Sequence, residues 1–287
     1  CRMEPEKRVL ELPLYSTDIP GAIANTSYLE TPKVGKDSLL RIWKVSKPTL
    51  TVYLSKNPRS NRTGVVICAG GGYRYLSIEK EGHNIAKWFQ QMGVTAAVLK
   101  YRLPHDDIME RKQEGPLQDA RRALMLMREN AGTWGLQKDQ IGIMGFSAGG
   151  HLAATASTLL SDDTLAQPAF SLLIYPVVSM GAYTHKGSRE RLLGVSPSDS
   201  LLQRYSCELQ VSENTAPAFL IHANDDTVVP PENSILYHRA LSAKGVSAEL
   251  HLYEKGGHGF AGAQGIGSAA NWQLQCKAWL QMHGWIE

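Results

Sequence analysis

From Val65 to the C-terminus, short apolar segments alternate with amphipathic ones, and this alternation constrains the fold more than any other feature of the sequence. Most of the apolar segments are too short for helices and too apolar for loops, as expected for strands covered on both faces. They lie at 65–68, 95–101, 141–146, 170–176, 218–223 and 247–253. The segments with helical spacing lie at 83–93, 116–131, 148–160, 232–245 and 268–284. The pattern predicts an α/β fold with a mainly parallel sheet flanked by helices.

The segments outside this alternation indicate how the rest of the chain is organised. Residues 39–56 resemble two antiparallel strands at a sheet edge, with Pro48 in or near the turn between them. Residues 180–215 are less regular and lie between two predicted strands, so we expect a small insertion that covers the carboxyl edge of the sheet like a lid. We predict an N-terminal tail and edge segment at 1–30 and a single domain at 31–287, because the sequence shows no repeat and no long linker.

Composition and charge exclude several classes of protein. Of the 287 residues, 43% are hydrophobic and 20% are charged, which is typical of a globular chain. The formal net charge of +3 is small and its basic residues are scattered, so we expect no nucleic-acid partner. The sequence contains no run of 18 or more apolar residues, so it predicts no membrane-spanning helix.

The first residue, Cys1, is followed by a polar segment, and this start resembles that of a mature bacterial lipoprotein. A lipid on Cys1 would anchor an otherwise soluble domain to a membrane, and would be its only contact with one. This reading predicts a protein of the bacterial periplasm or cell surface. The alternative is that Cys1 marks an arbitrary boundary of the chain.

Ser147 is the first candidate for a chemically active residue. It stands in Gly-Phe-Ser-Ala-Gly, a match to G-x-S-x-G between a predicted strand and a predicted helix. In so sharp a turn, side chains at Gly145 and Gly149 would collide with neighbouring backbone, and the turn lifts the serine hydroxyl out of the sheet. The amide of Ala148 would lie at a helix N-terminus, where it can stabilise an oxyanion. The sequence therefore predicts a nucleophilic serine, the alternative being a structural turn.

A serine nucleophile needs a base, and the base needs an acid that orients it. His258 stands in the glycine-rich segment EKGGHGFAG after the last predicted strand, from which an imidazole can reach the serine. For the other histidines a packed or solvated side chain is expected, including His105 in LPHDD, where a metal is a weaker alternative. Asp225 and Asp226 follow the strand at 218–223 and compete for the role of the acid. The chain order Ser, Asp, His is the order found in α/β hydrolases.

Three adjacent glycines follow the first long strand, in CAGGGYRYLS. The segment lacks the Gly-Lys-Ser/Thr of a phosphate-binding loop and the spacing of a dinucleotide site. Backbone without side chains can approach a carbonyl oxygen closely, so we expect the amides of Gly71 and Gly72 to form an oxyanion hole with Ala148. Residues that we expect to contact a substrate, unless they are ordinary surface residues, are Tyr73, Arg74, Tyr75, Tyr183 and His185.

From about Trp43 to the C-terminus, the chain resembles the α/β-hydrolase superfamily. The resemblance rests on GGGY, EGHNIAKWF, VLKYRLP, QDARRAL, GFSAGGHLA, HANDDTVVP and GGHGF. It is strongest to bacterial acetylxylan esterases, a carbohydrate-esterase branch, and to hormone-sensitive-lipase-like esterases. Asp226 precedes TVVP as the acid of the family precedes xxVP, which selects Asp226 over Asp225. Ala69 departs from the family, because many esterases of the HGGG type have His there.

The resemblance implies a serine carboxylesterase that hydrolyses small acyl esters, often acetyl groups on sugars of plant polysaccharides. Ser147 would attack the ester, His258 would transfer the proton and Asp226 would orient His258. No cofactor and no metal is expected, and the expected partner is a small-molecule or oligosaccharide ester. Two alternatives remain open, a serine peptidase of the same fold and a non-catalytic binding member.

Overall fold

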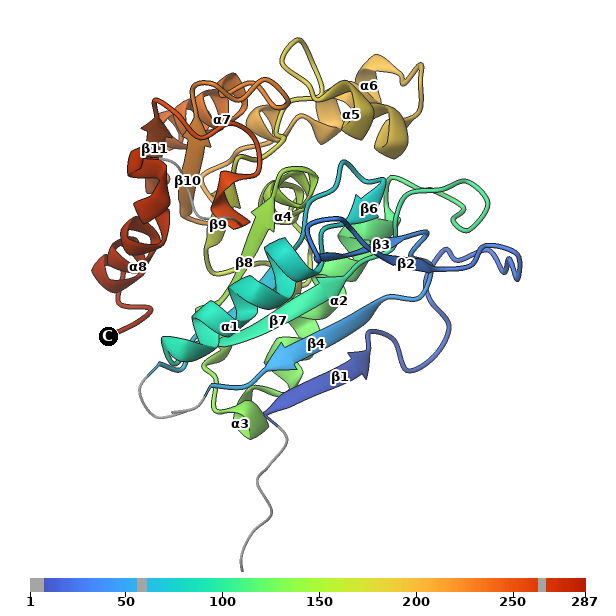
Figure 1. The fold of residues 1–287 in the computed structure, drawn as a ribbon, viewed down its shortest axis with the longest axis horizontal. Helices are drawn as coiled ribbons and strands as arrows, with labels where there is room; N and C mark the ends of the chain where they lie inside the picture. The colour runs from blue at the N-terminus through green and yellow to red at the C-terminus, as the bar shows by residue number, and fades with distance from the viewer. Residues whose placement is uncertain (1–7, 56–60, 263–266) are drawn as a thin grey trace, which may run out of the picture.

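The computed structural model describes residues 8–55, 61–262 and 267–287, which fold around an eight-stranded sheet (Figure 1). The strand order is β1-β4-β7-β5-β8-β9-β10-β11, and a smaller sheet has the order β2-β3-β6. In the large sheet β1 and β7 pair antiparallel with β4, and all other neighbours pair parallel. Cys1 lies outside the described residues, so a lipid on it stays a prediction.

The elements have the following bounds. The strands are β1 (Val9–Pro13), β2 (Thr31–Val34), β3 (Leu40–Trp43), β4 (Thr49–Tyr53), β5 (Gly64–Cys68), β6 (Tyr75–Leu76), β7 (Thr95–Lys100), β8 (Ile141–Phe146), β9 (Ser171–Ile174), β10 (Ala218–Ala223) and β11 (Ala248–Tyr253). The α-helices are α1 (Asn84–Gln91), α2 (Gly115–Glu129), α3 (Ala131–Trp134), α4 (Ala148–Thr158), α5 (Lys186–Leu193), α6 (Asp199–Tyr205), α7 (Glu232–Ala243) and α8 (Trp272–Met282). The short helices are η1 (Glu79–His83), η2 (Lys138–Gln140), η3 (Thr164–Ala166), η4 (Cys207–Leu209), η5 (Phe260–Gly262) and η6 (Gly267–Asn271).

Helices cover both faces of the large sheet, which explains why its central strands are apolar throughout. Helix α1 lies in front of β7 in Figure 1, and α8 shares its layer, since the rings of Trp88 and Trp272 lie 5.6 Å apart. Helices α2 and α4 contact each other and cover β5 and β8 from the other face. Every residue of β5, β8 and β10 is buried. The predicted α/β fold with a mainly parallel sheet and flanking helices is therefore confirmed.

The predicted strand pair at 39–56 is wrong in its pairing. Strand β3 pairs with β2 and β6 in the small sheet, whereas β4 pairs with β1 and β7 in the large one. Instead of turning back at Pro48, the chain crosses from one sheet to the other. The carbonyl of Val45 accepts a hydrogen bond from Leu103, and that of Pro48 accepts one from Leu14. Strand β1, whose residues alternate between exposed and half-buried, takes the edge position of the large sheet.

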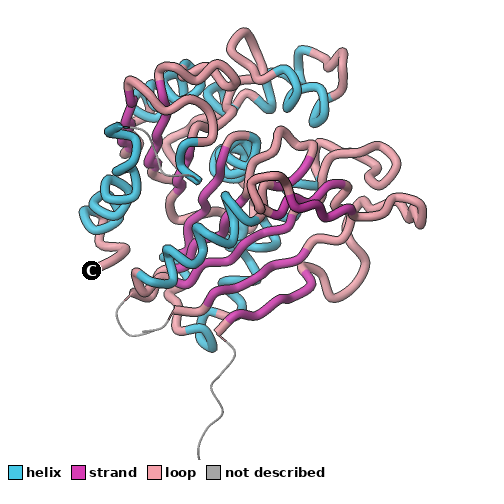
Figure 2. The backbone as a smooth tube through the Cα atoms, in the orientation of Figure 1, coloured by secondary structure: helices cyan, strands magenta, loops and turns pink. Residues whose placement is uncertain are grey.

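Residues 180–215 contain α5, α6 and η4, which lie beyond the upper end of the large sheet in Figure 1. Figure 2 shows many of the loops on this same side of the molecule. The side chain of His185 accepts a hydrogen bond from the Ser188 amide and so caps α5, as Ser198 caps α6. Nη1 of Arg191 donates to the carbonyl of Gly72 at 3.3 Å, which joins α5 to the glycine loop after β5. A lid function for this segment stays a prediction.

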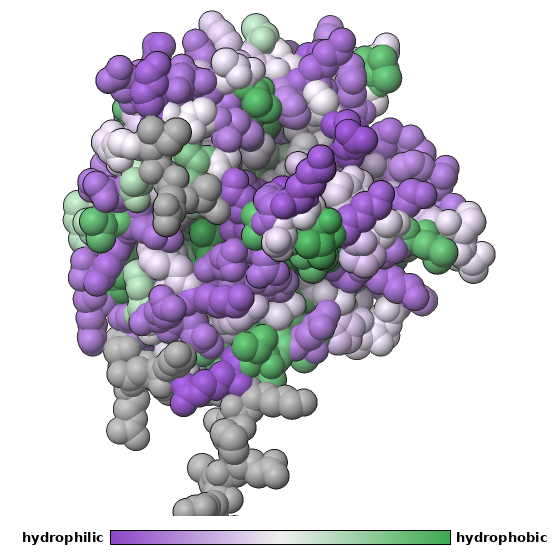
Figure 3. Space-filling model, in the orientation of Figure 1, coloured by the Kyte–Doolittle hydropathy of each residue, from purple (hydrophilic) through white to green (hydrophobic). Residues whose placement is uncertain are grey.

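The helices, and the face of the molecule shown in Figure 3, can be compared with what a membrane-bound surface requires. No helix among these residues is long and apolar enough to cross a bilayer. On the face shown in Figure 3, hydrophobic areas are small and are separated by hydrophilic residues. Scattered apolar side chains of this kind are ordinary for a globular surface.

Candidate active site

Ser147 occupies a strained turn between β8 and α4. Its backbone has φ 52° and ψ −117°, a conformation that non-glycine residues rarely adopt. A side chain at Gly145 would run into the carbonyl of Gly149, and one at Gly149 would run into the carbonyl of Cys68. The glycines of the motif are therefore required by close backbone approach, as the sequence predicts. Their effect is to hold the Ser147 hydroxyl at the carboxyl end of β8.

His258 lies between the other two predicted catalytic residues, Ser147 and Asp226, and contacts both. Its Nε2 lies 2.9 Å from Oγ of Ser147, and its Nδ1 lies 2.7 Å from Oδ2 of Asp226. Because an ionised carboxylate only accepts hydrogen bonds, Nδ1 carries the ring proton. Nε2 is then free to accept the proton of the serine hydroxyl. The three residues form one continuous line of hydrogen bonds that starts at a buried carboxylate.

Asp226 is held in its ionised form by four donors. Its Oδ1 accepts hydrogen bonds from the amides of Val228 and Val229, each at 2.9 Å. Its Oδ2 faces Nε2 of His222 at 3.3 Å in addition to His258. Burial alone would raise the pKa of Asp226, but the hydrogen bonds from His222 and His258 outweigh it and hold the pKa below its usual range.

Asp225 has a different task from its neighbour. Its Oδ1 accepts hydrogen bonds from the amides of Gly256 and Gly257, at 2.9 and 2.7 Å. These two glycines directly precede His258, so Asp225 fixes the loop that carries the imidazole. Of the two carboxylates, only Asp226 contacts the His258 ring, which agrees with the choice made from the sequence.

The glycine loop after β5 offers backbone donors beside Ser147. Gly71 has φ 130° and Gly72 has φ 63°, both in the region that favours glycine. Among the described residues, neither amide donates a hydrogen bond, and the amide of Ala148 is the first of α4. Gly71 and Gly72 line a cavity of about 420 Å³ together with Ser147 and His258. The size falls within the range of small-molecule sites.

Glu81 is a residue of the site that sequence reasoning missed. Although buried, it accepts hydrogen bonds from the amide of Gly70 at 2.9 Å and from the hydroxyl of Tyr175 at 2.8 Å. The ring of Tyr175 lies 4.9 Å from that of His258. Glu81 therefore connects the glycine loop to the packing around the imidazole. The acidic residue in the EGH segment was the available signal, but it resembles a solvated residue at the start of a helix.

The residues predicted to contact a substrate divide into two groups. Arg74, Tyr75 and His185 line the cavity at Ser147. Tyr73 does not line this cavity: its side chain is 2% exposed, its Oη lies 2.9 Å from Nδ1 of the buried His151, and it borders an adjoining cavity instead. A φ of 56° turns this tyrosine inward, an effect that its place after the glycines does not reveal. Tyr183 is exposed and is not among the residues that line the cavity.

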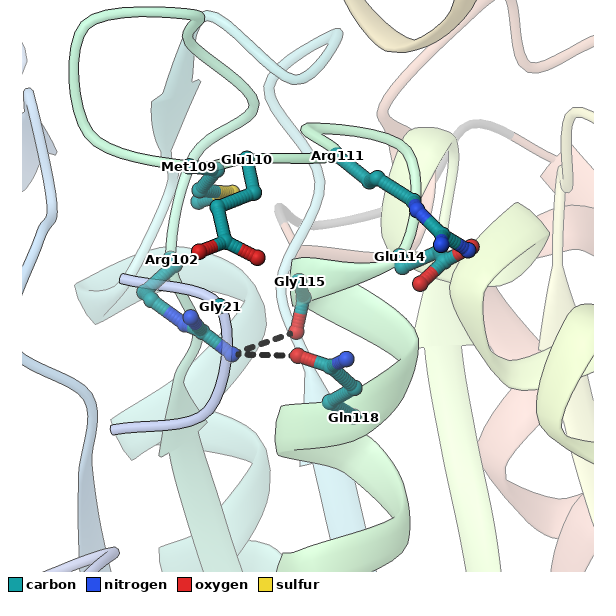
Figure 4. A pocket seen from close by; sticks show the side chains of 8 residues that line it. All are labelled: Gly21, Arg102, Met109, Glu110, Arg111, Glu114, Gly115 and Gln118. Carbon is teal, nitrogen blue, oxygen red and sulfur yellow. Dashed lines mark hydrogen bonds and ion pairs between the residues drawn. The ribbon is translucent and has the colours of Figure 1, made fainter. Parts of the chain in front are cut away.

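A second cavity, of about 210 Å³, lies beside α2 and shares no lining residue with the first (Figure 4). Arg102 pairs with two of its polar groups, since Nη2 donates to the carbonyl of Gly115 and to Oε1 of Gln118. Behind these contacts Arg102 forms a buried ion pair with Asp119 at 2.8 Å. The VLKYRLP and QDARRAL motifs thus meet in a structural contact rather than a reactive one.

The turn at His105 agrees with its interpretation as a solvated segment. His105 is about half exposed and lies 3.5 Å from the exposed carboxylate of Asp107. Within residues 8–55, 61–262 and 267–287, no group of three or more His, Cys, Asp or Glu side chains is arranged to hold a metal ion.

This sheet, with a sharp serine turn facing a histidine and an acid, makes the chain an α/β hydrolase. It belongs to the BD-FAE family, whose model matches residues 50–241. An acetylxylan esterase of Xylanibacter ruminicola is 35% identical over 233 residues, which cover 79% of this chain and 47% of that protein. An endo-1,4-β-xylanase B of Butyrivibrio fibrisolvens is 34% identical over 221 residues, which cover 74% of this chain and 34% of that protein. The chain thus spans less than half the length of these two curated relatives.

Among solved structures, an acetyl ester-xyloside bifunctional hydrolase of Caldicellulosiruptor lactoaceticus matches with a TM-score of 0.81. It is 31% identical, and the match covers 97% of both chains. The predicted fold and family are confirmed by these comparisons. The esterase relatives also support the predicted class of enzyme, a carboxylic ester hydrolase.

Proposed function

We propose that the chain is a serine carboxylesterase that removes small acyl groups, above all acetyl groups, from saccharides derived from plant polysaccharides. The observation that carries the proposal is the unbroken hydrogen-bond line from Asp226 through His258 to Ser147, which opens into a cavity. The relatives, an acetylxylan esterase and a xylanase among them, support xylan-related esters as the substrates. The proposed partner is therefore a small-molecule or oligosaccharide ester.

The proposed reaction follows from the geometry. Oγ of Ser147 attacks the ester carbonyl while Nε2 of His258 takes its proton, and Asp226 stabilises the imidazolium through Nδ1–H. The developing oxyanion accepts hydrogen bonds from the amides of Gly71 and Ala148, with that of Gly72 as a further donor. Loss of one such donor typically costs about 10²- to 10³-fold in rate.

The second half of the reaction uses the same residues. His258 gives its proton to the oxygen of the departing alcohol. The alcohol then leaves, and the acyl group stays bound to Ser147. Water, deprotonated by the same imidazole, then attacks the acyl-enzyme and releases the carboxylic acid.

Acetate release tests the proposal. Wild type and Ser147→Ala would be assayed on acetylated xylo-oligosaccharides and on 4-nitrophenyl esters of increasing acyl length. Because the nucleophile is removed, we expect the variant to lose on the order of 10⁴- to 10⁶-fold in kcat. Ser157→Ala, a buried serine of α4 outside the cavity, is the matched control.

Three outcomes would reject the proposal. An active Ser147→Ala variant would exclude the serine mechanism. Faster cleavage of peptide substrates than of esters in a parallel assay would favour a serine peptidase. Failure of a fluorophosphonate probe to label Ser147 would favour a non-catalytic binding member.

A further inference from the structure

A third cavity, of about 210 Å³, adjoins the one at Ser147. Arg74 and Arg191 line both cavities and so form their common wall. On the far side of these two arginines lie Lys44, Tyr28 and His105. A ligand that places its ester at Ser147 can therefore extend past the arginines into this space, which we name the basic cavity.

The charged side chains that line the basic cavity are all basic, and the exposed carboxylate of Asp107 lies 3.5 Å from His105 at its edge. Lys44, Arg74 and Arg191 are its charged lining residues, and no carboxylate lines it. Among the described residues, none of these three cations forms an ion pair. In the neighbouring cavity the one carboxylate, Glu81, already accepts two hydrogen bonds, and Arg41 is paired with Asp37. Lys80, whose Nζ donates to the carbonyl of Gly259, also lines that cavity and forms no ion pair with a described residue. Uncompensated positive charge therefore lines both cavities, and it includes the two arginines where they meet.

Two of the cations are held in place rather than free in solvent. Lys44 has φ 54°, a strained conformation for lysine, and its Nζ lies over the ring of Tyr28, 5.5 Å from the centroid. Arg191 is fixed by hydrogen bonds from Nη1 to the carbonyls of Gly72 and Gly187, at 3.3 and 2.9 Å. Burial and the nearby Arg74 lower the pKa of Arg191, so an anion between the two arginines would relieve their repulsion.

We propose that the basic cavity binds the carboxylate of an acidic saccharide, a uronic acid unit, whose neighbouring acetyl ester is hydrolysed at Ser147. The proposal rests on the proposed esterase function and names its substrate class. The charged groups of plant cell-wall saccharides are uronic carboxylates, and arginine guanidinium groups match a carboxylate with paired hydrogen bonds. Converging cations also raise the local concentration of an anionic substrate.

The experiment compares acetylated xylo-oligosaccharides of equal length with and without a glucuronic acid branch. We expect wild type to show a higher kcat/KM on the acidic substrate, and salt to reduce this preference because exposed charges are screened. Lys44→Gln and Arg74→Gln should each reduce the ratio of the two kcat/KM values by about two- to fivefold, the size typical of exposed ion pairs. Lys277→Gln, an exposed lysine on α8, is the matched control and should leave the ratio unchanged.

A second pair of substrates tests whether the carboxylate that the basic cavity binds belongs to the alcohol part of the ester or to its acyl part. Mono(4-nitrophenyl) succinate has its carboxylate on the acyl group, whereas 4-nitrophenyl butyrate has none. Preference for the succinate, with none for the acidic saccharide, would overturn the assignment of the carboxylate to the saccharide. Equal rates on acidic and neutral saccharides would overturn the proposal and leave the esterase function intact. Absence of hydrolysis on every ester would instead reject the esterase function, and the proposal with it.

Discussion

Replacing Asp226 by Asn tests the proposed triad sharply, because the structure dictates how the amide must lie. The amides of Val228 and Val229 donate to Oδ1, so the Asn oxygen must stay there and its NH₂ group takes the place of Oδ2. That group would donate to Nδ1 of His258, which moves the ring proton to Nε2. Nε2 would then donate to Ser147 instead of accepting its proton, and the base would be lost.

The expected loss is about 10⁴-fold in kcat, or about 5 kcal/mol in the barrier, as is typical when the base is left in the wrong tautomer. Initial rates on 4-nitrophenyl acetate near neutral pH measure it. Asp225→Asn is the matched control, because an amide oxygen can still accept from Gly256 and Gly257. We expect this control to stay within about fivefold of wild type, since both hydrogen bonds survive. A less than tenfold loss for Asp226→Asn, or an equal loss for Asp225→Asn, would refute the reasoning.

Three further predictions concern the support of the site. Glu81→Ala leaves two buried donors without an acceptor, so it should lower the free energy of unfolding by about 2–4 kcal/mol. It should also reduce kcat more than Glu81→Gln, which keeps one acceptor. Urea unfolding and initial rates check this, and equal kcat in both variants would contradict it. Gly149→Ala drives a methyl group into backbone and should leave little folded protein, whereas Gly132→Ala on α3 has open space and should not lower the melting temperature. The buried His151 has its pKa lowered to about 4, so between pH 6.5 and 4 the unfolded chain binds a proton that the native chain does not. The free energy of unfolding should therefore fall by about 3 kcal/mol as the pH falls through this window. In urea titrations, His151→Gln should make the free energy of unfolding less dependent on pH. The same pH dependence in the variant and in wild type would contradict this prediction.

The sequence predicts the strands of the sheet correctly where burial on both faces requires every residue to be apolar. The strands β5, β8 and β10 are covered on both faces, so burial alone requires a continuous apolar run, and the sequence displays it. The edge of the sheet gives no such signal, because β1 alternates between exposed and half-buried residues. Which strand β4 pairs with depends on a backbone crossing at 44–48 rather than on any pattern of side chains. The wrong pairing predicted for 39–56 follows from this.

The site divides in the same way. Ser147, Asp226 and His258 each follow a strand in a recognisable local motif, so their positions could be predicted from their neighbours in the chain. The placement of Tyr73 depends on one positive φ, and that of Glu81 on partners at Gly70 and Tyr175 that are distant in sequence. Contacts of this kind arise from packing, for which a single sequence carries no local signal.

The adjacent acids after β10 show why local pattern and tertiary contact must be combined. Both could accept hydrogen bonds, and only their partners distinguish them: Asp225 binds the backbone of the loop, while Asp226 binds the imidazole that the loop carries. A second histidine, His222, also faces Asp226, and its Nε2 carries a proton because the carbonyl of Val229 lies 3.0 Å away. That donor occupies part of Oδ2 and keeps the carboxylate ionised in a buried position. In the proposed mechanism a buried acid can thus orient His258 without taking its proton. His222 would support that acid, although its place in an apolar strand suggests only a packed side chain.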